Sequence, residues 1–356
     1  MGRQLSGSVP HGEPGRVNRD LVRALGEAGL LDAVFDEAGV TATELCAIRH
    51  GLARANTFAE TAFALQGLGA IPIQLAGSEA IKVEWIPRVR SGDAVAGFAL
   101  TEPGAGSDAA ALAMRAEPDG DGYRLSGTKT FISNAPEADI YSVFARTTEG
   151  AGARGVTAFA VPGDAEGLSG QAIALISPHP IGSLEFDGVY VSQSHVLGGV
   201  NQGFEVAMQT LDLFRPSVGA FALGMAEAAL AEAVRHSSER KAFGQAISKF
   251  QGVSHQLADV RVAIESAKHL VYAAASAHDS GDRERLTGLA AMAKLAATET
   301  AQNAVDVAIQ VLGARGLEQN SLLAHLYLEV RAPRIYEGTS EIQRNIIARE
   351  LFRGRL

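Results

Sequence analysis

Cysteine is almost absent from this chain of 356 residues, which contains only Cys46. One cysteine cannot form an internal disulfide, and no group of His and Cys residues has the spacing of a zinc site. A reducing, cytoplasmic location is the simplest expectation. Cations are also in the minority, because 31 Lys and Arg face 40 Asp and Glu, for a net charge of -9. Without clustered cations to neutralise phosphates, nucleic acid is not expected as a partner.

Long apolar runs are missing as well. A membrane-spanning helix needs about 18 or more consecutive apolar residues, and no segment provides them. The opening sequence MGRQLSGSVPHGEPGR lacks the apolar core of a signal peptide. We therefore expect no membrane partner. With 47% hydrophobic and 20% charged residues, the composition is that of a globular protein, and the length allows two or three domains.

The first part of the chain, residues 1–95, has the pattern of a small helical domain. Residues 1–17 are rich in Gly, Pro and Ser, which is typical of a frayed terminus. Apolar periodicity then predicts helices over 18–35, 42–55 and 57–67, and a further helical segment within 78–90. The helix in this last segment is expected to stop ahead of Pro87, since a proline disfavours helical conformation in the residue before it.

The middle part, residues 96–200, alternates in the manner of β-strands. Strands are predicted at 110–116, 123–128, 129–133, 140–146, 156–162, 173–176 and 184–191. No helices separate them, which favours an antiparallel sheet over a doubly wound one. The same absence argues against Gly104-x-Gly106 as a dinucleotide fingerprint, because that motif needs a crossover helix and a third glycine.

The last part, residues 201–356, returns to helical periodicity. Long Ala-rich amphipathic stretches cover 203–238, 247–280, 284–313 and 320–330, and a further helix follows Ser340. Long helices joined by short turns predict an antiparallel bundle. The expected fold class is therefore α+β and mostly α, with a helical domain, a β domain and a helical bundle in that order.

One turn near the C-terminus places a carboxylate in a fixed direction. Gly338 permits a tight bend directly after Glu337. Ser340 and Gln343 have the spacing of a capping box, so a helix is expected to begin there and run to about Phe352. A carboxylate on such a corner suits a general base. On these residues alone, the simpler interpretation is that Glu337 complements the helix dipole.

Four other stretches are candidates for binding. The loop Thr101–Asp108 exposes hydroxyls and free amides after Phe98 and Leu100, although an ordinary turn has the same composition. Residues 131–134 pair an aromatic ring with a hydroxyl, a combination that is more often part of a core. Residues 240–244 combine cations with an aromatic between two helices, and 310–316 end a helix in glycines, which a C-cap would also explain. Asp212 and Arg215 share a helix face, where a plain ion pair competes with ligand binding.

Taken together, these stretches resemble the acyl-CoA dehydrogenase family. The matches are LTEPGAGSD at 100–108, ERKAFGQAI at 239–247, QVLGARG at 310–316 and IYEGTSEIQR at 335–344, and the resemblance extends from about residue 20 to the end. It implies bound FAD and the α,β-dehydrogenation of an acyl-CoA thioester. Glu337 matches the family's catalytic base, which removes the α-proton while the β-hydrogen leaves as hydride to the flavin.

The resemblance also assigns binding residues. The expected FAD contacts are Phe98, Leu100, Thr101, Gly106, Ser107, Phe131, Ser133, Arg240, Phe243, Gln251, Gln310, Gly313, Ala314, Thr339 and Glu341. The expected substrate contacts are Ser107, Asp212, Arg215 and Gly338. No metal is expected. In the family, positions such as Arg240 and Gln310 hold FAD across a subunit interface, so a homo-oligomer, a dimer or tetramer, is implied.

Several departures set this chain apart within the family pattern. The helix that usually precedes residue 18 is missing, Phe131 occupies a common Trp position, and Ala314-Arg315 replaces the usual Gly-Asn. These features indicate a specialised member with a shortened N-terminus. An electron-transferring flavoprotein is the expected electron acceptor. The alternatives are an acyl-CoA oxidase that uses oxygen, and a desaturase of an acyl group bound to a carrier protein.

Overall fold

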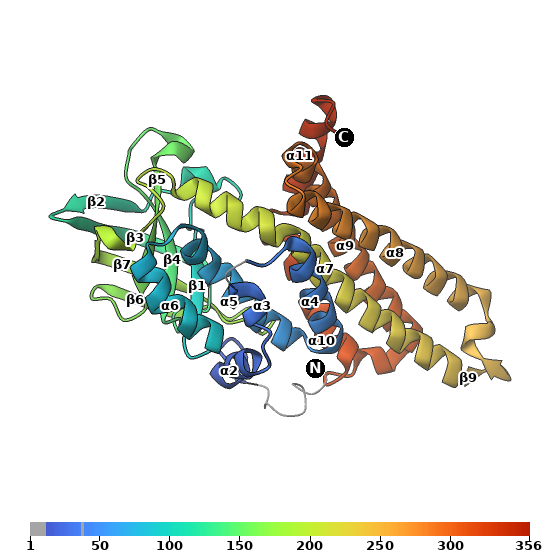
Figure 1. Ribbon diagram of the computed structural model, residues 1–356. Coiled ribbons are helices and arrows are strands. Elements are labelled where there is room, and N and C mark those ends of the chain that lie inside the picture. The colour runs from blue at the N-terminus through green and yellow to red at the C-terminus, as the bar shows by residue number, and fades with distance from the viewer. Residues whose placement is uncertain (1–11, 37–38) are drawn as a thin grey trace. The chain divides into compact units, whose positions relative to one another are not determined.

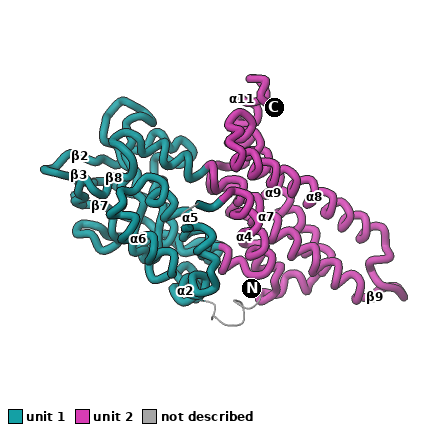
Figure 2. The backbone as a smooth tube through the Cα atoms, in the orientation of Figure 1, with its two compact units in different colours: residues 1, 3–40, 61–211 teal, residues 2, 41–60, 212–356 magenta. Residues whose placement is uncertain are grey.

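A computed structural model describes residues 12–36 and 39–356 of the chain (Figure 1). Helix accounts for 58% and strand for 17%, so the predicted fold class, α+β and mostly α, is confirmed. The described residues form two compact units (Figure 2). Unit 1 comprises 12–36, 39–40 and 61–211, and unit 2 comprises 41–60 and 212–356.

The helices at the start of unit 1 follow the predicted periodicity. Helix α2 (Arg19–Glu27) begins where the Asn18 side chain accepts a hydrogen bond from the Leu21 amide. Helix α3 (Asp32–Phe35) is a single turn. Helix α5 (Thr57–Ala76) is longer than expected and begins in the last residues of the first segment of unit 2. Helix α6 (Glu79–Ser91) carries an N-cap at Ser78.

The expected stop ahead of Pro87 is wrong. Helix α6 continues past the proline and ends at Ser91, where Gly92 adopts a left-handed conformation with φ of 80°. A helical residue at this position would donate to the carbonyl of Val83. Val83 is 72% exposed, so water can satisfy the carbonyl that the proline leaves free.

The sheet of unit 1 contains eight strands, in the order β6-β7-β3-β2-β4-β5-β8 with β1 paired to β4. Their bounds are β1 (Ala96–Ala99), β2 (Arg115–Asp119), β3 (Gly122–Ser133), β4 (Ile140–Arg146), β5 (Val156–Pro162), β6 (Leu168–Ala172), β7 (Ile181–Ser192) and β8 (Val196–Leu197). Most pairs are antiparallel, as predicted from the absence of crossover helices. The pairs β1–β4 and β2–β4 are parallel.

Two predicted strands lie elsewhere. The strand expected at 110–116 begins only at Arg115, because Ala109–Ala111 form a 3-10 turn. The carboxylate of Glu102 accepts hydrogen bonds from the amides of Ala113 and Met114. The strand expected at 173–176 is β6, residues 168–172. Pro178 and Pro180 cannot donate to a ladder, and the apolar Ile176 is 65% exposed.

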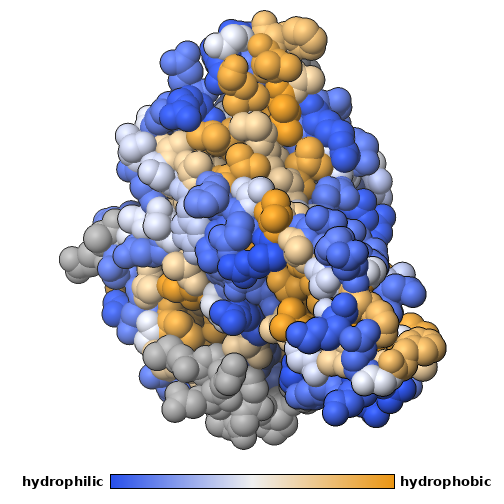
Figure 3. Space-filling model, turned by 90° about the vertical axis from the view of Figure 1, so that its right-hand side faces the viewer, coloured by the Kyte–Doolittle hydropathy of each residue, from blue (hydrophilic) through white to orange (hydrophobic). Residues whose placement is uncertain are grey.

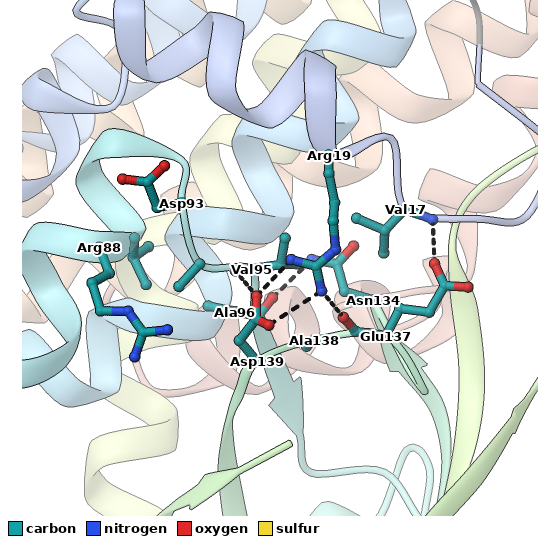
Figure 4. A network of polar contacts seen from close by, with 12 residues as sticks. Val17, Arg19, Arg88, Asp93, Val95, Ala96, Asn134, Glu137, Ala138 and Asp139 are labelled. Atoms are coloured by element: carbon teal, nitrogen blue, oxygen red, sulfur yellow. Dashed lines mark hydrogen bonds and ion pairs between the residues drawn. The ribbon is translucent and has the colours of Figure 1, made fainter. Parts of the chain in front are cut away.

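A network at the edge of the sheet attaches helix α2 to two strands (Figure 4). Both guanidinium nitrogens of Arg19 bind the carboxylate of Asp139, at 2.8 and 3.2 Å. That carboxylate also accepts the amide of Val95, at 2.7 Å. The side chain of Asn134, close by, donates to the carbonyl of Ala96. These bonds fix the start of β1 and the end of β3, the two strands that contain the candidate FAD-binding residues Phe98, Phe131 and Ser133.

Unit 2 consists of long helices that pack through small residues. They are α4 (Ala42–Ala55), α7 (Gly203–Glu239), α8 (Gln251–Asp279), α9 (Arg283–Leu312), α10 (Leu322–Glu329) and α11 (Ser340–Phe352), with a short hairpin of β9 (Lys241–Ala242) and β10 (Gln245–Ala246). The first nine residues of α7, 203–211, belong to unit 1. A Cβ on Gly219 of α7 would come within 2.7 Å of Val271 on α8. The predicted bundle therefore packs with little space between its backbones.

Helix α8 starts later than predicted, since residues Ile247–Lys249 form a separate 3-10 turn. Helix α7 is long and apolar enough to cross a membrane by length and composition, but 78% of its most apolar window is buried in the protein. A core helix of a globular protein satisfies the same criterion.

Candidate active site

The turn that carries Glu337 has an unusual backbone. Glu337 has a φ of 52° and Gly338 a φ of 92°. A left-handed conformation costs a non-glycine residue about 1–3 kcal/mol unless the surroundings enforce it. Gly338 cannot be replaced freely, because a Cβ there would lie 2.6 Å from the Gln343 side chain. Two successive left-handed residues thus set the direction of the carboxylate.

The helix after this turn begins differently from the prediction. The N-cap is Thr339, whose hydroxyl accepts the amide of Ile342, so the capping box expected for Ser340 and Gln343 is wrong. Ser340 instead donates to Glu299 on α9, at 2.7 Å. Gln343 donates to the carbonyls of Glu337 and Gly338, at 3.3 and 2.9 Å. The two side chains expected to cap α11 therefore hold the turn, while Thr339 serves as the cap.

One oxygen of the Glu337 carboxylate, Oε2, is buried without a hydrogen-bond partner within residues 12–36 and 39–356. Although the residue as a whole is partly exposed, burial of the carboxylate raises the pKa of Glu337. The cations Arg49, Arg215 and Lys294 oppose that rise, and burial outweighs them. Such a group accepts a proton more readily than a solvated glutamate.

The three cations near Glu337 have different partners. Arg49 on α4 binds Glu60 at 2.5 Å and the Ser217 hydroxyl at 2.7 Å. Arg215 on α7 binds Asp212 at 2.8 Å, so the intrahelical ion pair considered from the sequence is present. The Arg215 Nε is buried without a partner among the described residues.

Lys294 on α9 is fully buried and donates to the Gly338 carbonyl, at 2.6 Å. Two of the cations, Arg49 and Arg215, are thus compensated by other carboxylates. Lys294 forms no ion pair within the described part of the chain.

The sequence reasoning did not single out Arg49 or Lys294. Both lie in helices whose periodicity indicates apolar packing. The sequence did contain one signal for them: each is a charged residue at a position that the periodicity assigns to the core. An unpaired lysine is almost never fully buried, so a lysine at such a position needs an explanation.

The candidate FAD-edge residues of unit 1 lie on two adjoining segments. Phe98 and Leu100 are buried, at 8% and 7% exposure, and Gly106 and Ser107 are exposed. A Cβ on Gly106 would meet nothing within 4 Å, so packing within the chain does not require a glycine there. A ligand that approaches the backbone closely would require one.

Phe131 differs from the expectation that residues 131–134 form part of the core. The residue is 58% exposed, and its φ is 55°. Strand β3 is irregular relative to β7 between Lys129 and Ile132. The amide of Thr130 donates to the carbonyl of Thr101, at 3.0 Å, and the nearby Ser133 is buried. An exposed aromatic ring on a strained backbone beside a loop of free hydroxyls is a suitable surface for a planar cofactor.

A buried ion pair that the sequence reasoning missed supports this surface. Lys129 is fully buried and donates to Glu102 at 2.8 Å and to the Leu100 carbonyl at 3.0 Å. Burial lowers the pKa of Lys129 to about 8, against the opposing charge of Glu102. Because strand residues alternate between faces, the inward position of Leu125 predicts that Lys129 also points inward. That alternation was the signal for this pair.

The remaining candidate FAD residues lie in unit 2, in three segments. Arg240 and Phe243 belong to the hairpin between α7 and α8, Gln251 is the first residue of α8, and all three are exposed. Phe243 is 95% exposed and has a φ of 50°. The second segment, at the end of α9, contains the exposed Gln310, Gly313 and Ala314.

The third segment is the start of α11, where Thr339 is partly exposed and Glu341 is exposed. Figure 1 shows the β9 hairpin and α11 at different ends of the long helices. A single copy of unit 2 therefore does not place Arg240 and Thr339 at one site.

Comparison with known proteins identifies the family. The models of the acyl-CoA dehydrogenase N-terminal, middle and C-terminal domains match residues 9–93, 97–189 and 201–352. The chain belongs to the acyl-CoA dehydrogenase family, as the resemblance indicated, and is an oxidoreductase with FAD as its cofactor.

Three similar proteins illustrate the relationship. Cyclohexane-1-carbonyl-CoA dehydrogenase of Geobacter metallireducens is 36% identical over 347 residues, which cover 95% of this chain and 90% of the relative. Butyryl-CoA dehydrogenase from Megasphaera elsdenii superimposes with a TM-score of 0.89 at 34% identity, over 95% of this chain and 91% of that one. The FAD complex of PigA gives 0.89 at 26% identity, over 95% and 90%.

Proposed function

We propose that this enzyme removes the α-proton of an acyl-CoA thioester with Glu337 and passes the β-hydrogen to FAD. The observation that carries the proposal is the Oε2 atom of Glu337, which is buried and has no partner among the described residues. Leaving a buried polar atom unsatisfied is costly. The cost is explained if this oxygen accepts a proton from a substrate C–H group directed at it.

The environment of Glu337 suits proton abstraction beside a thioester. An α-proton is very weakly acidic, and a solvated glutamate with a pKa of about 4.3 is a poor base for it. Burial raises the pKa of Glu337 while three cations keep the ionised form accessible. The left-handed turn fixes the carboxylate before substrate arrives, which lowers the entropic cost of reaching a reactive geometry.

FAD, when bound, supplies the acceptor for the β-hydrogen and its electron pair. In unit 1, Phe131 would lie against the ring system, with Thr101 and Ser133 at its edge and Phe98, Leu100, Gly106 and Ser107 completing the contact. In unit 2, Arg240, Phe243, Gln251, Gln310, Gly313, Ala314, Thr339 and Glu341 would hold the rest. The exposed Phe131 and the open Gly106 are the observations that support this fit.

The acyl-CoA would be bound by Ser107 of unit 1 and by Asp212, Arg215 and Gly338 of unit 2. The buried and unpartnered Nε of Arg215 is a donor available to a ligand. The acyl chain itself stays open, and a short linear chain, a ring and a dicarboxylate are all reasonable candidates.

A homo-oligomer would complete the FAD site. The hairpin that carries Arg240 and Phe243 and the start of α11 lie at different ends of the long helices (Figure 1). On the face drawn in Figure 3, apolar side chains gather in several areas between polar ones. Unit 2 exposes large apolar residues, among them Phe243, Val262, Leu317 and Phe352. These features favour a second copy of the chain as the partner that covers them.

The electron acceptor is proposed to be an electron-transferring flavoprotein, and the cytoplasmic location stays a prediction. Reoxidation by oxygen with peroxide release would instead indicate an oxidase. Activity on an acyl group attached to a carrier protein, but not to CoA, would indicate a desaturase of carrier-bound substrates.

The decisive experiment is anaerobic bleaching of the flavin absorbance by a panel of butyryl-CoA, cyclohexane-1-carbonyl-CoA and glutaryl-CoA. At least one member should bleach the wild type. The variant Glu337→Gln should keep its FAD and bleach roughly 10²-fold to 10⁴-fold more slowly, because it loses only the proton acceptor. Glu117→Gln, at a position exposed on strand β2, is the matched control and should bleach at the parent rate. Parent-like bleaching by Glu337→Gln would remove this residue from its role.

A further inference from the structure

Helix α9 packs against the turn that carries Glu337, and its Lys294 contacts that turn. Lys294 is fully buried, and its neighbours along α9 are small buried residues such as Ala290, Ala291, Ala293 and Ala297. Removing an ammonium group from water is costly unless it finds strong partners. Among the described residues outside its own helix, the Nζ atom of Lys294 donates to the Gly338 carbonyl, at 2.6 Å. Packing alone does not account for a lysine at this position.

The accepting carbonyl belongs to the residue directly after Glu337. Gly338 is left-handed, and its carbonyl also accepts the Gln343 side chain, at 2.9 Å. The turn is therefore held from α11 by Gln343 and from α9 by Lys294. Five residues further along α9, Glu299 accepts a hydrogen bond from the Ser340 hydroxyl and binds Arg334, at 2.7 and 2.8 Å. Helix α9 thus fixes both sides of the segment that directs the carboxylate.

The positive charge of Lys294 also interacts electrostatically with Glu337. The cations that face Glu337 are Arg49 from α4, Arg215 from α7 and Lys294 from α9. Arg49 and Arg215 are compensated by Glu60 and Asp212. The charged groups that face Lys294 are Glu337, Arg215, Glu299 and Glu341, with Glu337 the strongest attraction. Lys294 is therefore the cation whose charge is least compensated by another carboxylate.

We propose that Lys294 is a positioning residue for Glu337, which holds the Glu337–Gly338 turn through the Gly338 carbonyl and contributes a positive charge that no ion pair among the described residues compensates. This inference rests on the proposed role of Glu337. It assigns two separable contributions to one side chain. The hydrogen bond sets the direction of the carboxylate, and the charge favours its ionised form, which is the form that can accept a proton.

The two contributions predict different pH behaviour. Burial lowers the pKa of Lys294 to about 8, and the Glu337 carboxylate opposes that change, so at pH 7 the ammonium form predominates. Loss of the cation removes one of the interactions that lower the pKa of Glu337. The base would then ionise only at higher pH. The acid limb of the bleaching rate should move to higher pH, and the defect should shrink as the pH rises.

The test compares Lys294→Met with Lys294→Gln in the FAD-loaded enzyme. Methionine removes both donor and charge, whereas glutamine keeps an N–H donor for the Gly338 carbonyl without the charge. The probe is the panel acyl-CoA that bleaches the wild type fastest, in anaerobic stopped flow from pH 6 to 9. Lys268→Met, which removes a lysine paired with Glu227 at 3.6 Å in the same unit, is the control for loss of a cation.

Lys294→Met should bleach roughly 10- to 100-fold more slowly at neutral pH, because a displaced base reacts poorly. FAD content and the substrate concentration for half-maximal rate should change far less. Both Lys294 variants should show the acid limb at higher pH, and Lys294→Gln should approach the wild-type rate at pH 9. The Lys268→Met enzyme should keep the wild-type profile.

Several outcomes would overturn the inference. One is a wild-type rate and pH profile in Lys294→Met, and another is a rate loss that parallels FAD loss with an unmoved acid limb, which would indicate a purely structural role. Failure of the proposed function would give a result different from failure of this inference. If the proposed function is wrong, no panel member bleaches the wild type, or Glu337→Gln bleaches at the parent rate.

Discussion

Each unit of this enzyme buries one lysine beneath a segment assigned to the active site, and the two lysines are arranged differently. In unit 1, Lys129 binds a carboxylate and a carbonyl, those of Glu102 and Leu100. In unit 2, the one hydrogen-bond partner of Lys294 outside its own helix among the described residues is a carbonyl, that of Gly338. Burial lowers the pKa of both to about 8. The ion pair of Lys129 stabilises the loop that contains Glu102, whereas the charge of Lys294, which has no ion-pair partner among the described residues, can act on Glu337.

The largest stability effect is expected from breaking the compensated pair. Lys129→Met leaves the Glu102 carboxylate buried without its cation, which typically costs ~3–5 kcal/mol. The midpoint of urea unfolding should fall accordingly, and FAD should be retained less well because the segment from Leu100 to Glu102 is released. Lys294→Met should show the opposite pattern, in which the bleaching rate falls more than the stability does. Equal unfolding midpoints for Lys129→Met and wild type would contradict the distinction.

An intermediate effect is expected from a second compensated group, the carboxylate of Glu227. His50 lies 3.4 Å from it, and Arg54 and Lys268 lie 3.6 Å from it. The proximity of His50 is the main cause that lowers the pKa of Glu227 to about 2 from its usual 4.5. A depressed carboxyl pKa stabilises the fold above pH 4.5, and this contribution disappears as the pH falls toward 2.

Glu227→Gln should therefore cost ~2 kcal/mol at neutral pH. The difference from wild type in the free energy of unfolding should shrink between pH 4.5 and 2, and urea titrations across that range would measure it. Unlike Glu337→Gln, this variant should bleach at a normal rate. A constant difference across the acid range would show that Glu227 contributes by packing and not by charge.

The smallest effect is expected where the carboxylate of an exposed residue is held mainly by backbone amides. Asp279, at the end of α8, accepts the amides of Ala42 and Thr43 at the start of α4, at 2.7 and 3.0 Å. It acts as a cap supplied by another helix, so Asp279→Ala should cost ~1 kcal/mol. Thermal unfolding would measure the loss. A stability unchanged from wild type would show that water replaces the carboxylate without penalty.

Much of the architecture followed from periodicity and turn residues. The helices of unit 2 and strands β3, β4, β5 and β7 lie close to their predicted positions. The errors arose where a side chain far along the chain decides the local structure. Glu102 shapes the segment before β2, and Thr339 replaced Ser340 as a cap because Glu299 binds the Ser340 hydroxyl. Local pattern contains no information on such partners.

The candidate site was predictable to a different degree. Glu337 and its glycine were evident from the turn, and the resemblance supplied their chemistry. The buried cations Arg49 and Lys294 were not evident, because each is recognisable only when helices distant in sequence are packed together. The exposure of Phe131 was not evident from the residues alone, since a strand pattern cannot reveal the irregularity that turns an aromatic ring outward, although the resemblance placed this ring against the flavin.

The left-handed backbone at Glu337 has a consequence for engineering this enzyme. Glycine adopts that conformation without strain, and it would leave no unsatisfied carboxylate in the interior. A search for more stable variants that ranks sequences by folding energy alone would therefore tend to replace this glutamate. In this family member, a residue that the fold accommodates at a cost is the one on which turnover is proposed to depend.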